Sequence, residues 1–255
     1  MTAVLQRVSI SRTREIMADA AARYATAKLQ EALKRKKLVR LVAATGASQL
    51  DFLSRLTAVK EIDWARIELF HLDEYVGVGT DHPASFARYI KERIIEPTGI
   101  QKYHLLDGSK DPKAVIEEAN AAISSAPVDV AFVGIGENAH LAFNDPPADF
   151  ETREPYLIVT LDEPCRKQQV GEGWFKSVDE VPKQAISMSV RQIMSAGAIV
   201  CTVPDERKAW AVRASLSEPV TPEIPASILK THGDVQFFLD GPSAKLLLEE
   251  NTAAR

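Results

Sequence analysis

A chain of 255 residues can bury a core that needs no disulfide or metal to hold it together. Its 31 Lys+Arg and 35 Asp+Glu residues give a net charge of −4, which argues against nucleic-acid and membrane-surface partners. Hydrophobic residues make up 45% of the chain while Gly and Pro are sparse, so a disordered or fibrous protein is excluded.

The predicted elements alternate between helix and strand. Residues 11–37 are rich in Ala and predict a helix, residues 38–44 predict a buried strand, and apolar residues then recur at helical spacing from 50 to 56. The elements predicted after these are a strand at 67–72, a helix from Pro83 to about 95, a helix at 111–124, strands at 128–135, 157–161, 185–190, 198–203 and 235–239, and helices at 206–216, 226–230 and 243–250.

This alternation predicts an α/β fold of the Rossmann-like type: a doubly wound, mostly parallel sheet flanked by helices on both faces. No internal repeat or linker interrupts it, so we expect residues 1–255 to form a single domain. In such sheets a ligand binds outside the carboxyl ends of the strands. The loops after Ala44, Leu72 and Ile135 should therefore converge on one site.

Cysteine usage and hydropathy bear on the compartment. Cys165 and Cys201 are too few for a disulfide-stapled secreted scaffold or a clustered zinc site. The N-terminus lacks the apolar core of a signal peptide, and no apolar run approaches the ~20 residues that cross a bilayer. We expect a reduced, cytoplasmic protein without a membrane segment.

Thr45-Gly46-Ala47-Ser48 joins a predicted strand to a predicted helix. Unpaired amides and the dipole at a helix N-terminus favour an anion such as phosphate. The same residues also suit a turn and a helix cap without a ligand. No Lys follows the glycine and G-x-G-x-x-G is absent, which argues against a nucleotide kinase and a dinucleotide-dependent dehydrogenase.

Asp73 follows a predicted strand and has a second acid, Glu74, beside it. Asp73 could act as a proton-transfer base if burial or the neighbouring carboxylate raises its pKa toward neutrality, or it could simply cap a loop. His71 and Asp73 could also bind a metal together with His82 and His140, although no ligand spacing of a known metal site supports this alternative.

The glycine-rich segment 134–145 contains His140, whose side chain titrates near neutral pH. Gly136 would let the backbone approach a ligand closely, and Asn138 and Asp145 could orient the imidazole ring. A core histidine in a glycine-punctuated turn fits these residues equally well. Convergence with Asp73 and the 45–48 turn favours the catalytic alternative.

These motifs resemble the family of glucosamine-6-phosphate deaminases and 6-phosphogluconolactonases. The segment Ala142-Phe143-Asn144 after the histidine is similar to the deaminase branch. The matching segments, in chain order, are 41–48, Phe70-His71-Leu72-Asp73-Glu74-Tyr75, Asp81-His82-Pro83-Ala84-Ser85, 134–146, 181–187, Arg207-Lys208-Ala209 and Pro225-Ala226-Ser227-Ile228-Leu229 with His232.

The resemblance implies hydrolytic isomerisation of glucosamine 6-phosphate to fructose 6-phosphate and ammonia in amino sugar catabolism, with no metal or organic cofactor. Asp73 would then carry a proton between C2 and C1, and His140 would assist ring opening while Asp145 and Asn138 tune it. The implied substrate-binding and phosphate-binding residues are Thr45, Gly46, Ala47, Ser48, Gly136, Arg166 and Lys208.

Several positions depart from the family pattern. Residue 138 is Asn where some members carry Asp, residue 139 is Ala where Gly is usual, and residue 145 is Asp where Glu is usual. The family's phosphate arginine has no clear counterpart in 165–175, where Arg166 is the candidate. The effector-site pattern of allosteric members is not matched at 153–156, so we predict no activation by an N-acetylated sugar phosphate.

Two other functions are compatible with these residues. A lactonase would use His140 to activate water and would not need Asp73 as a carbon base. A non-catalytic sugar-phosphate-binding protein is favoured by the substitutions at 138, 139 and 145. All three hypotheses predict a small-molecule partner, and the resemblance to some members adds a possible homo-oligomer.

Overall fold

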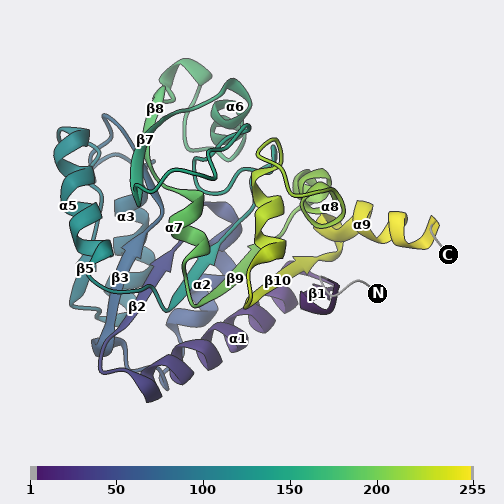
Figure 1. Cartoon of the computed structure of the whole chain (residues 1–255), viewed down its shortest axis with the longest axis horizontal. Coiled ribbons are helices and arrows are strands. Elements are labelled where there is room, and N and C mark those ends of the chain that lie inside the picture. The colour runs from purple at the N-terminus through teal and green to yellow at the C-terminus, as the bar shows by residue number, and fades with distance from the viewer. Residues whose placement is uncertain (1–4, 254–255) are drawn as a thin grey trace.

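A seven-stranded parallel sheet runs through the centre of the computed structural model, which describes residues 5–253 (Figure 1). In spatial order its strands are β1 (Val8–Ser11), β10 (Val235–Asp240), β9 (Ala198–Val203), β6 (Val130–Val133), β2 (Val39–Ala43), β3 (Ile67–His71) and β5 (Lys102–His104). The strand order reverses between β6 and β2, because the chain moves outward from β2 to β3 and β5 but in the opposite direction from β6 to β9 and β10. A crevice forms at such a switch point, outside the carboxyl ends of the strands.

Helices cover both faces of this sheet, as the alternating pattern predicts. Leu41 of β2 packs under one helical layer, and the next residue, Val42, packs under the other. The first layer contains α1 (Arg14–Arg35), α2 (Leu50–Thr57), α3 (Phe86–Ile90), the π-helical turn η4 (Lys91–Ile95) and α4 (Glu96–Thr98). The second contains α5 (Pro112–Ser124), α7 (Val190–Met194), α8 (Ala209–Ser217), the 3₁₀ helix η7 (Pro225–Thr231) and α9 (Gly241–Ala253).

A second, antiparallel sheet was not predicted. It consists of β4 (Asp73–Tyr75), β8 (Gln184–Met188) and β7 (Tyr156–Thr160), and with α6 (Glu163–Gly171) it lies at one end of the molecule (Figure 1). The strands predicted at 157–161 and 185–190 therefore form, but they do not join the parallel sheet. Strand β7 has only one fully buried residue in five, whereas an interior strand of a sheet covered on both faces is buried throughout.

The remaining corrections concern helix ends and short elements. The helix predicted from Pro83 begins at Phe86, because the Ser85 hydroxyl accepts the amide of Arg88 and caps the helix. Strands β1 and β5 and helices α6 and α7 were not predicted, and residues 226–230 form a 3₁₀ helix. The five further short 3₁₀ helices are η1 (Leu5–Arg7), η2 (Ala47–Gln49), η3 (Trp64–Arg66), η5 (Val178–Glu180) and η6 (Glu206–Lys208).

None of the helices within residues 5–253 combines the length and the hydropathy that crossing a bilayer requires.

Candidate active site

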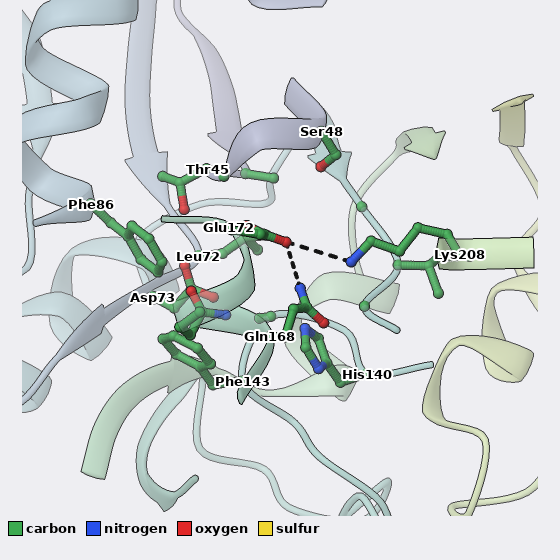
Figure 2. Close-up of a pocket in the computed structure, with 17 residues that line it drawn as sticks. Thr45, Ser48, Leu72, Asp73, Phe86, His140, Phe143, Gln168, Glu172 and Lys208 are labelled. Atoms are coloured by element: carbon green, nitrogen blue, oxygen red, sulfur yellow. Dashed lines mark hydrogen bonds and ion pairs between the residues drawn. The ribbon is translucent and has the colours of Figure 1, made fainter. Parts of the chain in front are cut away.

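A cleft opens at the switch point between β2 and β6 (Figure 2). The loops after Ala44, Leu72 and Ile135 converge there, as predicted. The structure brings together residues from six separate segments of the chain in this cleft: 44–48, 72–73, 86, 134–143, 168–172 and 208. The predicted site residues that line it are Thr45, Gly46, Ser48, Asp73, Gly136, His140 and Lys208.

The turn after β2 leads into η2 and then directly into α2. Gly46 adopts φ +95°, a left-handed conformation that glycine takes without strain. Tyr89 donates its hydroxyl to the carbonyl of Gly46 at 3.1 Å, and Arg14 donates to the carbonyl of Ala47. These contacts hold the turn from behind. Ala47 itself does not line the cleft, unlike its neighbours in the predicted phosphate turn.

Among the described residues that line the cleft, Lys208 is the one lysine or arginine. It ends η6, and its side chain is only 5% exposed. Its Nζ lies 3.6 Å from Oε1 of Glu172 and 3.8 Å from Oε1 of Glu137. Burial lowers the pKa of Lys208, and the two carboxylates oppose that shift.

Asp73 begins β4, where the chain leaves the parallel sheet, and is 6% exposed. Its carboxyl group stands between the rings of Phe86 and Phe143 (Figure 2) and accepts no hydrogen bond from the part of the chain that the structure describes. Burial, with a smaller contribution from the charge of Glu74, raises the pKa of Asp73 to about 8. The environment thus meets the condition for a carboxylate base near neutral pH.

Glu74 points into different surroundings, because successive residues of a strand face opposite sides. Its carboxylate accepts the Ser85 hydroxyl at 2.8 Å and the amides of Phe86 and Ala87 at 3.2 and 2.8 Å. Burial raises the pKa of Glu74 to about 7 although these hydrogen bonds oppose the shift. Glu74 therefore anchors the start of α3, and Asp73 alone of the two acids lines the cleft.

His140 lies in the cleft with a polar network behind it. Its Nδ1 is 3.2 Å from Oδ1 of Asp145, within ion-pair distance but without the alignment of a hydrogen bond. Asn138 donates to the same Oδ1 at 3.1 Å, and its own Oδ1 accepts the amide of His140 at 3.2 Å. Burial raises the pKa of Asp145, but His140, Asn138 and the amide of Asp162 outweigh it and leave the pKa below its usual range. Asn138 and Asp145 thus contact the histidine and do not line the cleft.

Ala139, where glycine is usual in the family, adopts φ +67°. This left-handed conformation is strained for alanine but not for glycine.

Three residues of the 168–172 segment line the cleft and were missed from the sequence: Gln168, Gln169 and Glu172. Phe86 and Phe143 were also missed as lining residues. Two features of the sequence could have indicated them. Asp162 followed by Glu163-Pro164 is typical of a helix start, and Gln168 and Glu172 have the i, i+4 spacing that places two side chains on one face of a helix. Asp162 does cap α6, accepting the amide of Cys165.

Arg166 does not lie where a phosphate ligand is expected. Its guanidinium donates to the carbonyl oxygens of Val178 and Val181, and the residue does not line the cleft. The reason is its position on α6, from which it extends toward η5 while Gln168 and Gln169 face the cleft. Among the described residues, no arginine lines this cleft.

The four residues weighed as metal ligands do not come together. His71 is buried, and its Nε2 accepts the amide of Leu106. His82 accepts the amide of Ala84 through Nδ1. A different group, made by His140 with Asp145 and Cys165, has ligand atoms within 4.8 Å of one another. Burial and the adjacent carboxylates raise the pKa of the Cys165 thiol, which keeps it protonated.

The fold and this cleft define an α/β protein with a buried carboxyl group, a histidine and a lysine assembled at the switch point of a doubly wound sheet. The chain belongs to the family of glucosamine-6-phosphate isomerases and 6-phosphogluconolactonases, whose family model matches residues 12–237. Its curated relatives include proteins named glucosamine-6-phosphate deaminase. The relative from Lactobacillus delbrueckii subsp. bulgaricus is 35% identical over 207 residues, covering 80% of this chain and 86% of the relative. That from Streptococcus pneumoniae serotype 4 is 33% identical over 205 residues, with 80% and 86% covered.

Solved structures extend the comparison. A monomeric glucosamine-6-phosphate deaminase matches with a TM-score of 0.86 and 29% identity, over 94% of this chain and 99% of that one. The 6-phosphogluconolactonase of Trypanosoma brucei matches with a TM-score of 0.77 and 18% identity, over 94% and 98% of the two chains. The second likeness concerns the fold alone.

Proposed function

We propose that this protein is a glucosamine-6-phosphate deaminase, which converts glucosamine 6-phosphate and water to fructose 6-phosphate and ammonia. The observation that carries the proposal is Asp73, a buried carboxyl group in the cleft with a pKa raised to about 8. A lactonase has no use for a base aimed at carbon, whereas a deaminase requires one. The deaminase names of the relatives support the same choice.

The proton transfer follows from the chemistry of an open-chain amino sugar. The C1 aldehyde acidifies the C2 proton, so a positioned carboxylate suffices to remove it. Asp73 would take the proton from C2 and return it to C1, while O1 gains a proton and the amine nitrogen loses one, which leaves a C1 hydroxyl and a C2 imine. Water would then add to that imine and ammonia would leave, which gives the ketose phosphate. Nothing in this sequence consumes an oxidant or a reductant.

His140 is suited to the ring opening that must come first. Opening a pyranose requires a proton to leave the C1 hydroxyl and another to reach the ring oxygen. Histidine can serve as both acid and base near neutral pH. The contacts of its Nδ1 with Asp145 and of its amide with Asn138 would keep the ring directed into the cleft.

The phosphate would lie at the Thr45–Ser48 turn with Lys208 as its cation. Helix-start amides and a buried ammonium both favour a dianion over a neutral hydroxyl. This turn and Asp73 line the same cleft. With the phosphate held at the turn, the distance from the turn to Asp73 would determine which carbon of the sugar lies at the carboxylate.

The test is to supply the purified protein separately with glucosamine 6-phosphate, galactosamine 6-phosphate and 6-phosphogluconolactone, and to follow ammonia, ketose phosphate and acid. We expect ammonia and fructose 6-phosphate from the first substrate. Asp73→Asn should abolish ammonia release, while Asp81→Asn, an exposed loop carboxylate, serves as the matched control. Acid from the lactone that survives Asp73→Asn, without ammonia from either amino sugar, would contradict the proposal.

We further infer a cytoplasmic enzyme that acts on a small molecule without a nucleic-acid or membrane partner. The homo-oligomer expected from the resemblance remains a prediction, and the solved deaminase relative is described as monomeric.

A further inference from the structure

The carboxylate of Glu172 lies in the place where the proposed function puts the phosphate. Its Oε2 is 3.8 Å from the position that a Cβ would take on Gly46, so it faces the phosphate turn directly. Its Oε1 is 3.6 Å from Nζ of Lys208, the cation of the same subsite. Figure 2 shows the carboxylate between the turn and Lys208.

Three partners hold Glu172 in this position. Gln168 donates its amide to Oε1 at 2.8 Å, and the indole of Trp174 donates to Oε2 at 3.2 Å. Lys208 is the third, at ion-pair distance. The side chain of Glu172 is only 9% exposed, so solvent screens its charge weakly.

This pairing makes physical sense for an empty cleft. A buried ammonium group without a counter-ion is strongly unfavourable, and Glu172 supplies that counter-ion to Lys208. A bound phosphate would supply the same charge to the same lysine. Two anions cannot share a partly buried subsite around one cation without repulsion, so the phosphate and the carboxylate exclude each other.

The backbone around Glu172 is suited to such an exchange. Gly171 and Gly173 flank it, and α6 ends at Gly171. Gly173 has φ +85°, and within the described residues no atom beyond its own chain neighbours lies within 4 Å of where its Cβ would be. Glycines at the end of a helix lower the cost of rearranging the next residue.

We propose that Glu172 is an internal competitor for the phosphate subsite, and hence a residue that determines how tightly this protein binds phosphorylated sugars. A substrate phosphate takes over Lys208 and the turn, and Glu172 swings out with the last turn of α6. This inference rests on the proposed function for the identity of the anion. It assigns to Glu172 a role opposite to that of a phosphate ligand: its charge weakens binding.

The test measures phosphate affinity and catalysis separately. Glu172→Gln keeps the shape and removes the charge, so we expect it to lower the KM for glucosamine 6-phosphate and the Kd for inorganic phosphate by roughly tenfold. The kcat should change by less than about twofold, because Glu172 stabilises neither the reacting carbons nor the leaving ammonia. Trp174→Phe removes one hydrogen-bond donor that holds the carboxylate, so it should also lower the Kd for inorganic phosphate, by about two- to threefold.

Glu137→Gln is the matched control. Its carboxylate is also within 4 Å of Lys208, but it does not line the cleft and its side chain is 35% exposed. We expect its effect on phosphate affinity to stay below about threefold. If both variants change the phosphate affinity equally, the effect comes from negative charge near Lys208 in general and not from a carboxylate that occupies the subsite. That result would contradict the proposal.

Two further outcomes separate this inference from the proposed function. If the wild type releases ammonia from glucosamine 6-phosphate, but folded Glu172→Gln and Trp174→Phe bind phosphate with unchanged affinity, the inference is wrong and the proposed function stands. If both variants bind inorganic phosphate more tightly but the wild type releases no ammonia, the inference stands and the proposed function is wrong. A third outcome would also contradict the inference. If the wild type turns over unphosphorylated glucosamine and Glu172→Gln does so more slowly, Glu172 binds a substrate hydroxyl.

Discussion

Gly136 and His140 are packed so closely that any side chain at position 136 would displace the imidazole ring or the turn. A Cβ on Gly136 would lie 2.2 Å from Nε2 and 2.3 Å from Cε1 of the imidazole ring. The two residues are also joined through the backbone, since the amide of Gly136 donates to the carbonyl of His140 at 3.0 Å. The glycine therefore decides where the ring of the proposed acid–base residue can stand.

Gly136→Ala should lower kcat/KM about 100-fold or more while the protein stays folded, because the ring must leave its place or the turn must shift. The free energy of unfolding should fall by about 1–3 kcal/mol, measured by urea denaturation. Gly233→Ala is the control, because a Cβ there would meet no atom within 4 Å in the part of the chain that the structure describes, its two chain neighbours aside. Wild-type activity in Gly136→Ala would show that His140 is not needed in this position.

Asp73→Asn should stabilise the folded protein at alkaline pH even as it removes activity. The pKa of Asp73 is about 8 in the fold against an ordinary value near 3.9, so between these values folding requires an unfavourable proton uptake. Its contribution to stability is therefore lost progressively as pH rises from about 4 to 8. We expect the variant to gain on the order of a few kcal/mol at pH 8, and almost nothing near pH 4.

Urea denaturation of the wild type and of Asp73→Asn at several pH values measures that difference directly. Comparing the two proteins cancels the titration of groups that do not interact with Asp73, such as His71. A difference that does not change with pH would mean that Asp73 is ionised in the cleft throughout this range.

The rate of catalysis should depend on pH through the same group. A base must be ionised to act, and with a pKa of about 8 only roughly a tenth of the empty sites hold an ionised Asp73 at pH 7. The kcat/KM for glucosamine 6-phosphate should therefore rise about tenfold per pH unit below 8 and level off above it. Initial-rate measurements of ammonia release test this, and a flat profile between pH 6 and 8 would rule out Asp73 as the titrating base.

Asn138→Asp, which reproduces a residue found in some family members, should be unfavourable in this chain. Asn138 donates to Asp145 at 3.1 Å and to Asp162 at 3.5 Å. A third carboxylate would replace two hydrogen bonds by repulsion, so we expect a loss of about 1–3 kcal/mol at pH 7.

The loss from Asn138→Asp should shrink near pH 5, where one of the carboxyl groups takes up a proton. A second change, Asp162→Asn, should restore most of the stability, which a double-mutant cycle in urea would measure. Equal stability of Asn138→Asp and the wild type at both pH values would contradict this account of the network.

Much of the fold was predictable because its signals are local. The strand at 39–43, its turn and the following helix are evident from the change of hydrophobic period alone, and α5 starts after Asp111, whose side chain caps it. The small sheet was not predictable, because β7 and β8 read like any other short apolar runs. Whether they pair with each other or with the parallel sheet depends on packing around Tyr75 and Phe175, which are distant in sequence.

The site divides in the same way. Thr45, Asp73, His140 and Lys208 belong to short motifs of the sequence, and the alternation of strands and helices places the loops that carry them at one edge. Arg166 and Glu172 stand six residues apart on the same segment, and their sequence positions do not tell which one reaches the cleft.

The sequence by itself determined most of the longer helices and strands, the class of the main sheet and the residue types available for chemistry, since propensity, period and capping act between near neighbours. Only the tertiary structure decided the burial that raises the pKa of Asp73, the glycine contact that places His140 and the carboxylate that faces the Thr45–Ser48 turn. Desolvation and charge pairing depend on every group within a few ångströms, and those groups come from segments that only folding brings together.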